Sequence, residues 1–275
     1  MLAADLYASG HQEIAAWDLQ FTDPASAPSR RVAHSGVRSA KSAAAALADA
    51  TLVICAVTAP ECVCAATTAA ASIAPNAAFL DLNSVSPTTR AIAAAAISAG
   101  GGRYVEAAVM SPIAPARIAS AMLLGGPHAA AFLPQARQLG FAGATVFSDI
   151  IGRASAAKMC RSAIVKGIEA LLTESLLAAR RYGVEDAVLE SLRDVLPVGD
   201  WRTLSRYMIG RSMQHGRRRA AEMREVAITV REAGVEPWMS RACAERQDWA
   251  AAREHADAHP SLNALLDAIL AARSN

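Results

Sequence analysis

The chain has 275 residues, 53% of them hydrophobic and 19% charged, so it is long enough for two domains and too apolar to be disordered. Its net charge of +2 argues against a nucleic acid as the main partner. We find no segment with the bulk of a membrane span and no signal peptide, so we expect a cytoplasmic protein. Five scattered cysteines, with Cys62 and Cys64 as a close pair, lack the further ligands of a zinc site, and we predict no metal.

The first half of the chain alternates helical and extended patterns. A helix is predicted over residues 1–9, followed by a strand that ends at Asp18 and by a loop over residues 21–30. Further helices are predicted over residues 41–49, 60–72, 88–99 and 127–139, and further strands over residues 52–58, 78–82, 103–109, 121–124 and 144–147. This alternation predicts βαβ units and a parallel sheet.

Beyond Asp149 the pattern is helical. Residues 152–183 contain no proline and predict one long helix. Other helices are predicted over residues 186–196, 201–233, 236–256 and 261–272. We therefore predict a nucleotide-binding α/β domain over residues 1–150 and an all-helical substrate and dimerisation domain over residues 151–275.

Polar residues recur along the long helix at spacings of three and four and share one face. They are Lys158, Ser162, Lys166, Glu169 and Thr173. Apolar residues fill the other faces, so we expect this helix to be buried on those sides and wet along the polar face, where we expect the chemistry. Plain ion pairs of Lys158 or Lys166 with nearby acids are the simpler alternative.

Asp18 indicates a cofactor. An acidic residue at the end of the second strand of a doubly wound sheet is placed to accept a hydrogen bond from a ribose hydroxyl. Because a carboxylate repels a 2′-phosphate, Asp18 favours NAD over NADP. An ordinary loop cap is the alternative role.

The expected first strand and its G-x-G-x-x-G loop, which would meet the pyrophosphate, are missing because the chain opens inside the first helix. In the strand order 3-2-1-4-5-6 that strand is central, so its loss leaves residues 14–17 and 52–57 without a neighbour or forced together. A sequence that begins late explains this pattern. A protein that has lost its cofactor is the alternative.

Three segments carry motifs of one enzyme family. Residues 79–89, FLDLNSVSPTT, are similar to D-x-S-T-x-x-P. Residues 105–112, VEAAVMSP, are similar to D-A-P-V-S-G-G, and residues 152–162 to G-x-G-x-x-x-K-x-x-x-N. Together they resemble the β-hydroxyacid dehydrogenase family, which includes 3-hydroxyisobutyrate and 6-phosphogluconate dehydrogenases. The helical half looks closer to an uncharacterised 6-phosphogluconate-dehydrogenase-like branch.

The resemblance implies a Rossmann-type α/β domain followed by an all-α domain, a homodimer joined through the helices, and NAD or NADP as cofactor. It implies hydride transfer to or from a small β-hydroxy acid or related polar alcohol, with Lys158 as general acid/base and Ser162 in place of the family's asparagine. The cofactor contacts are then Val57, Thr58, Ala59, Asn83 and Ser84, and the substrate contacts are Met110, Ser111, Pro112, Lys166 and His215. For His215 a plain surface role is the alternative.

The segment at residues 110–112 departs from the family, because Met-Ser-Pro replaces Ser-Gly-Gly and removes donors for a substrate carboxylate. An imine- or ketone-reducing relative therefore stays open, as does a non-catalytic binding or scaffold protein. The expected partners are a small-molecule substrate and a second copy of the chain, with neither a nucleic acid nor a membrane.

Overall fold

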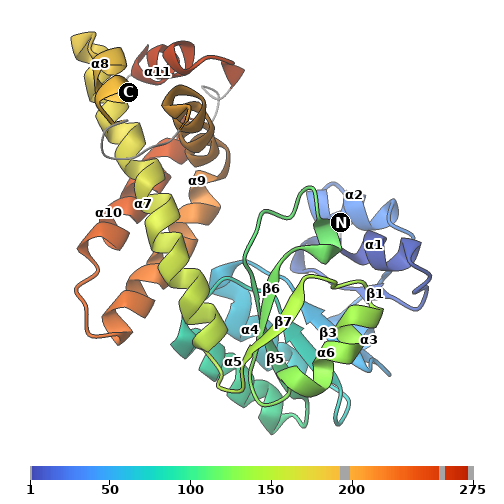
Figure 1. Cartoon of the computed structure of the whole chain (residues 1–275). Coiled ribbons are helices and arrows are strands. Elements are labelled where there is room, and N and C mark those ends of the chain that lie inside the picture. The colour runs from blue at the N-terminus through green and yellow to red at the C-terminus, as the bar shows by residue number, and fades with distance from the viewer. Residues whose placement is uncertain (1, 193–198, 254–257, 272–275) are drawn as a thin grey trace. The chain divides into compact units, whose positions relative to one another are not determined.

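The structure is a computed structural model that describes residues 2–192, 199–253 and 258–271 (Figure 1). The chain forms two compact units, Met1–Lys158 and Met159–Asn275. The division falls inside the long helix α7 (Arg153–Tyr182), eight residues beyond the domain boundary predicted at residue 150. Helices and strands alternate before α7, and only helices follow it in the described chain. The predicted fold class, a Rossmann-type α/β domain followed by an all-α domain, is confirmed.

A five-stranded sheet forms the centre of the first unit. Its order is β3 (Leu52–Cys55), β4 (Ala78–Asp81), β5 (Arg103–Val109), β6 (Met122–Gly125), β7 (Ala144–Ser148). Neighbouring strands are parallel except β5 and β6, which are antiparallel. β4 is buried along its whole length, as expected for an apolar strand with helices on both faces.

Different helices cover the two faces of this sheet. Phe79 and Tyr104 belong to a core shared with α3, α4 and α5, and Leu80 and Val105 belong to a core shared with α6. Successive residues such as Phe79 and Leu80 enter opposite cores because side chains alternate along a strand. The helices are α3 (Ala43–Leu47), α4 (Cys62–Ala70), α5 (Pro87–Ala99) and α6 (Ala129–Gln138).

The N-terminal segment makes a separate, two-stranded sheet. Its elements are α1 (Leu2–Ala8), β1 (Ala15–Ala16), η1 (Leu19–Thr22), α2 (Ala27–Ala33) and β2 (Arg38–Ser39). β1 and β2 pair in parallel with each other, and in the described chain neither joins the larger sheet. The loop predicted over residues 21–30 is wrong at its end, where α2 begins. Ser26 caps that helix by accepting a hydrogen bond from Ser29 N at 3.2 Å, and Pro28 occupies its first turn.

The second unit is built from α7 and the helices that follow. These are α8 (Glu185–Ser191), α9 (Trp201–Glu232), α10 (Trp238–Ala251) and α11 (Leu262–Ala271). They confirm the helices predicted there, except for residues 193–196, 254–256 and 272, which lie outside the described residues. No helix in the described parts of the chain combines the length and the hydrophobicity of a bilayer-spanning segment.

The polar face of α7 is buried, so the prediction that this face is wet is wrong. Its exposed fractions are 8% for Ser162, 8% for Lys166, 2% for Glu169 and 0% for Thr173. The exposed residues of α7 include an apolar stripe of Ile164 (67%), Ile168 (37%) and Leu171 (55%). The polar face is stable inside because α9 supplies partners of opposite charge: Glu222 pairs with Lys166, and Arg219 with Glu169. Helical periodicity identified the face but not what covers it.

Candidate functional site

The carboxyl ends of three parallel strands define one edge of the sheet. Cys55, Asp81 and Glu106 are paired across β3, β4 and β5. Ligands of open α/β sheets bind outside the carboxyl ends of the strands, so this edge is the candidate site. The predicted cofactor residues Val57 to Ala59 follow β3, and Asn83 and Ser84 follow β4.

Asn83 locks the turn that follows β3. Its side chain is 2% exposed, and its Oδ1 accepts a hydrogen bond from Val57 N at 2.7 Å. Its Nδ2 donates to the sulfur atoms of Cys55 and Cys62 at 3.4 and 3.5 Å. The bonds of Asn83 thus go to the protein, and it supports the exposed turn from below. Asn83 was predicted to contact the cofactor, and in the structure it holds the turn that carries Val57.

A buried ionic group lies directly beneath the same edge. Arg90, on α5, is 0% exposed, and its Nη1 meets Asp81 Oδ1 at 2.8 Å and Asp81 O at 2.8 Å. Its Nη2 donates to the carbonyl oxygens of Asn83 and, at 3.2 Å, of Ala107. Tyr104 donates from its hydroxyl to Asp81 Oδ2 at 2.7 Å. We call Asp81, Asn83, Arg90 and Tyr104 the strand-end network.

The protonation of this network follows from its burial. Burial lowers the pKa of Arg90, but Asp81, Tyr104 and Glu106 together outweigh burial and raise the pKa above its ordinary value. Burial raises the pKa of Tyr104 well above that of an exposed tyrosine, although Arg90 opposes the shift. Arg90 is therefore charged and Tyr104 a neutral donor at physiological pH. The network holds the strand ends.

The residues predicted to meet the substrate after β5 are accessible. Met110 and Ser111 are half-buried and Pro112 is exposed. Met110 N donates to Ala121 O at 2.8 Å, which fixes the start of this segment. They follow the carboxyl end of β5, and their side chains offer a ligand one hydroxyl group and no charge.

The predicted residues on the helices are divided between the two units. Lys158 is half-buried at the end of the first unit, and Ser162 is buried in the second. Lys166 was expected to contact substrate, but its Nζ forms an ion pair with Glu222, and the side chain is 9% exposed. Burial lowers the pKa of Lys166, while Glu222 raises it. His215 lies half-buried on α9.

Asp18 caps η1, because its side chain accepts a hydrogen bond from Gln20 N at 2.8 Å. This is the loop-cap role considered above, and it engages Oδ1 of the carboxylate. Ser26 and Ser29 both donate from their hydroxyls to Gln20 O, at 2.9 and 3.2 Å, so η1 and α2 form one local substructure with Asp18 at its start.

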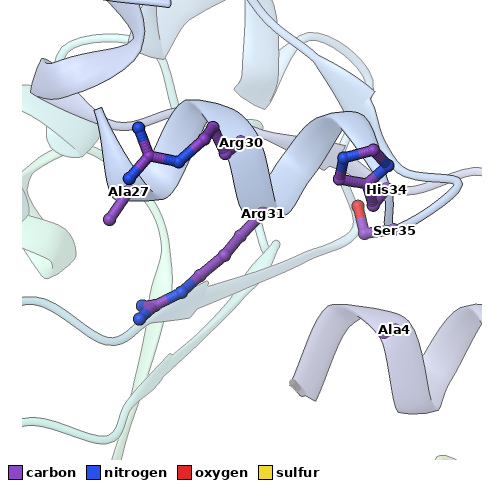
Figure 2. Close-up of a pocket in the computed structure, with 6 residues that line it drawn as sticks. All are labelled: Ala4, Ala27, Arg30, Arg31, His34 and Ser35. Atoms are coloured by element: carbon purple, nitrogen blue, oxygen red, sulfur yellow. The ribbon is translucent and has the colours of Figure 1, made fainter. Parts of the chain in front are cut away.

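A shallow hollow of about 470 Å³ borders this substructure and is basic. It is lined by Ala4, Ala27, Arg30, Arg31, His34 and Ser35 (Figure 2). Figure 2 shows Arg31 directed away from α2, whereas the Arg30 guanidinium lies back toward Ala27 and bonds to Ala25 O. The sequence contains no acidic residue between Asp23 and Asp49, so no acidic neighbour in the sequence balances these cations. Such a surface favours an anion.

Sequence reasoning missed four residues that shape this edge: Asp81, Arg90, Tyr104 and Glu106. The signal was present in part, because a carboxylate inside an apolar strand must have a buried partner. Glu106 is 0% exposed and accepts hydrogen bonds from the main chain at the start of α7. Among the described residues, no group of three or more His, Cys, Asp or Glu side chains is suited to a metal ion.

The edge fits a nicotinamide dinucleotide in the chemistry of its donors. Val57 and Thr58 are exposed, and the turn that carries them is held from below by Asn83, so a ligand meets a fixed main chain. Thr58 and Ser84 add hydroxyl groups at the same edge. A fixed, exposed main chain with hydroxyl groups beside it suits the polar parts of such a cofactor.

Comparisons with known proteins agree with this geometry. A family model described as the NAD binding domain of 6-phosphogluconate dehydrogenase matches residues 2–150, and a domain of unknown function, DUF1932, matches residues 179–250. The comparison with curated proteins gave no match.

Solved structures resemble the whole chain. A conserved hypothetical protein from Sinorhizobium meliloti 1021 is 35% identical, with 98% of this chain and 91% of that chain covered and a TM-score of 0.74. The conserved protein MTH1747, of unknown function and described as similar to 3-hydroxyacid dehydrogenases, is 28% identical. The match covers 90% of this chain and 91% of that chain, with a TM-score of 0.68. A Mycobacterium tuberculosis 3-hydroxyisobutyrate dehydrogenase shares the fold at 20% identity. The match covers 99% of this chain and 94% of that chain, with a TM-score of 0.68.

Proposed function

Because the chain belongs to the family of the NAD binding domain of 6-phosphogluconate dehydrogenase, we propose that it is an NAD(P)-dependent oxidoreductase. The reaction transfers a hydride between the nicotinamide and a small β-hydroxy acid or related polar alcohol. One observation carries the proposal within the matched domain: Asn83 fixes the exposed turn after β3 through Val57 N at 2.7 Å. A fixed turn at the carboxyl edge of a parallel sheet is suited to such a cofactor.

Each residue of the edge has a role in this proposal. The cofactor, when bound, supplies the hydride acceptor or donor. Asp18 accepts a hydrogen bond from a ribose hydroxyl, and Asn83 acts through the turn that it holds. The nicotinamide end is lined by Val57, Thr58, Ala59 and Ser84, and the substrate by Met110, Ser111 and Pro112. His215 belongs to the second unit and stays a substrate contact predicted from the sequence alone.

Lys158 moves the proton. In the oxidation, the amine of Lys158 takes the substrate's hydroxyl proton at Nζ as the hydride leaves carbon, and in the reverse direction the ammonium donates that proton to the carbonyl oxygen. Ser162, one helical turn further along α7, donates a hydrogen bond to the substrate. We leave Lys166 out of the substrate site because Glu222 occupies its ammonium group.

Replacing Lys158 tests this assignment. Lys158→Ala should lower the turnover of β-hydroxy acids such as 3-hydroxyisobutyrate by about 10²- to 10⁴-fold, the usual contribution of a general acid/base. NADH and NADPH should bind as before, because the strand ends are unchanged. Lys41→Ala is the matched control, since Lys41 is exposed in the same unit. Unchanged turnover in Lys158→Ala would reject the role of Lys158.

We further propose that Asp18 makes NAD the preferred cofactor, and the basic hollow offers the competing preference. Asp18→Ala should weaken the binding of NADH more than the binding of NADPH. The substitution removes the contact with the ribose of NADH, and it also removes the repulsion between the carboxylate and the 2′-phosphate of NADPH. If the basic hollow instead binds that phosphate, Arg31→Ala should weaken the binding of NADPH more than the binding of NADH. Fluorescence titration of both variants with both cofactors separates these cases. An equal loss for both cofactors in Asp18→Ala would contradict ribose recognition.

We propose that the chain forms a homodimer through the apolar stripe of Ile164, Ile168 and Leu171. These residues recur at helical spacing on the outside of α7, while the polar residues of the same helix are inside. A second copy of the chain offers the same stripe, so one surface can pair with itself. Covering this stripe removes apolar area from water, which is the main driving force of association.

Sedimentation tests the dimer. The native chain should sediment as twice 28.6 kDa, and the double variant Ile164→Glu/Leu171→Glu as 28.6 kDa. Ala130→Glu, which adds the same charge at an exposed position of α6, should remain dimeric. A dimer that survives the double substitution must be held by another surface.

A further inference from the structure

Glu106 connects the sheet to the start of α7. It lies on β5, in the middle of the five-stranded sheet, and is 0% exposed. Its Oε2 accepts a hydrogen bond from Gly152 N at 2.5 Å, and its Oε1 accepts one from Ser155 N. Both carboxylate oxygens are therefore used by main-chain N–H groups at the beginning of one helix, all within the first unit.

These N–H groups need a partner. The first four N–H groups of an α-helix have no acceptor inside the helix, and the helix dipole favours a negative charge beside them. A local Ser, Thr, Asp or Asn usually supplies the acceptor, whereas here a strand almost fifty residues earlier in the chain does so. The cap therefore also fixes where α7 begins relative to the sheet.

Glycine residues make room for this arrangement. A Cβ at Gly125 would lie 3.0 Å from Glu106 Oε2, so a larger residue there would crowd the carboxylate. Gly152 has φ +92° and a Cβ there would meet Pro87 Cβ at 3.0 Å, so the chain both turns and approaches α5 closely at the start of α7. Ser155 adds a bond of its own, from its hydroxyl to Val85 O.

We propose that Glu106 is a positioning residue that sets Lys158 against the strand-end edge by capping α7 from the sheet. Lys158 lies three residues after Ser155, about one helical turn further along the same helix. Glu106 and Val85 thus hold the first turn of α7, and the helix carries that constraint directly to the Lys158 backbone. The inference rests on the proposed function, because it concerns the group that we assign to proton transfer.

Glu106→Gln tests the cap with little change in size. The amide retains one acceptor and turns a donor toward the second N–H group, so one capping bond is lost and the negative charge with it. Amide hydrogen exchange should become about tenfold faster in peptides covering residues 152–158, as expected when a hydrogen bond worth about 1.4 kcal/mol is lost. Peptides covering residues 78–85 should exchange as before. Glu245→Gln, at an exposed position on α10, is the matched control.

Steady-state kinetics separate positioning from general damage. In Glu106→Gln we expect kcat to fall by about 10²-fold, the effect of a misplacement near 1 Å, while the Kd of NADH and NADPH is unchanged. Gly125→Ala is a second variant for the case that Glu106→Gln fails to fold. It keeps the carboxylate but crowds it, and it should reproduce the split between kcat and Kd.

Unchanged exchange at residues 152–158, or parallel losses of kcat and cofactor affinity, would overturn the positioning role. Failure of the proposed function looks different. A native chain that binds neither NADH nor NADPH and turns over no β-hydroxy acid rejects the oxidoreductase, and the catalytic part of this inference with it. Faster exchange in Glu106→Gln would then still establish the cap.

Discussion

The two units each bury charged groups, but they use them differently. In the first unit, the strand-end network places one cation, Arg90, among the carbonyl oxygens of Asp81, Asn83 and Ala107 and the Asp81 carboxylate. In the second, the helix network, which we define as Lys166, Glu169, Arg219 and Glu222, consists of pairs between side chains of α7 and α9. In the strand-end network the cation binds main-chain carbonyl oxygens as well as a carboxylate, whereas the helix network joins side chains only to other side chains.

This difference predicts which network tolerates change. Carbonyl oxygens at the end of a strand cannot be removed by substitution, so they need Arg90 whatever the neighbouring side chains are. The main chain of α7 and α9 is already satisfied within the helices, so the helix network can be replaced by apolar side chains of similar size. The strand-end network is therefore a support for the site, and the helix network mainly selects how two helices pair.

The largest effect is expected at Arg90. Arg90→Met should lower the free energy of unfolding by about 3 to 5 kcal/mol, because it leaves a carboxylate uncompensated in a fully buried position. Urea denaturation measures this loss. Arg103→Met is the matched control: Arg103 is exposed and donates a hydrogen bond to Asn76 O at 2.8 Å, and its removal should cost at most about 1 kcal/mol. Similar losses in the two variants would mean that the strand ends do not depend on Arg90.

A smaller effect is expected in the helix network. Lys166→Met should cost about 1.5 to 3 kcal/mol, the range for a hydrogen bond to a charged group, because Glu222 keeps Arg218 as a second partner. The sharper test is rescue. Lys166→Met/Glu222→Leu should be at least as stable as Lys166→Met, whereas Arg90→Met/Asp81→Leu should recover little, since the carbonyl oxygens remain without a donor. Equal rescue in both pairs would remove the distinction between the networks.

The sequence predicts the order and type of elements well because local patterns decide them. The strands predicted over residues 52–58 and 103–109 are found at Leu52–Cys55 and Arg103–Val109, and the absence of proline across residues 152–183 marks α7 correctly. α2 was missed because two prolines and two serines indicate a loop as readily as a capped first turn. The distinction depends on one hydrogen bond at Ser26, which composition does not reveal.

The site was harder to predict because its supports come from distant residues. Asp81 and Glu106 stand out as charges within apolar strands, yet their partners, Arg90 and the start of α7, are chosen by the fold. The same limit explains why the polar face of α7 was predicted to be exposed although it is buried. Periodicity places Lys166 and Glu169 together, but their partners lie on α9, about fifty residues later. A polar stripe that is buried and one that is exposed to solvent have the same sequence pattern.

The smallest predicted effect distinguishes the networks by pH. Burial lowers the pKa of Lys166 below the ordinary 10.5, so above that lowered pKa the unfolded chain binds one more proton than the folded chain. The contribution of Lys166 to stability is therefore lost as pH falls through its folded pKa and returns as pH rises toward 10.5, with a slope of at most about 1.4 kcal/mol per pH unit.

The unfolding free energy of Lys166→Met, measured from neutral pH to 10.5, should lack this rise, and that of exposed Lys41→Met should keep it. Arg90 should contribute no such slope, because its pKa is raised and it stays charged throughout. A pH dependence unchanged by Lys166→Met would mean that the Lys166 ammonium remains charged and matched by Glu222, as firmly held as Arg90 is by Asp81.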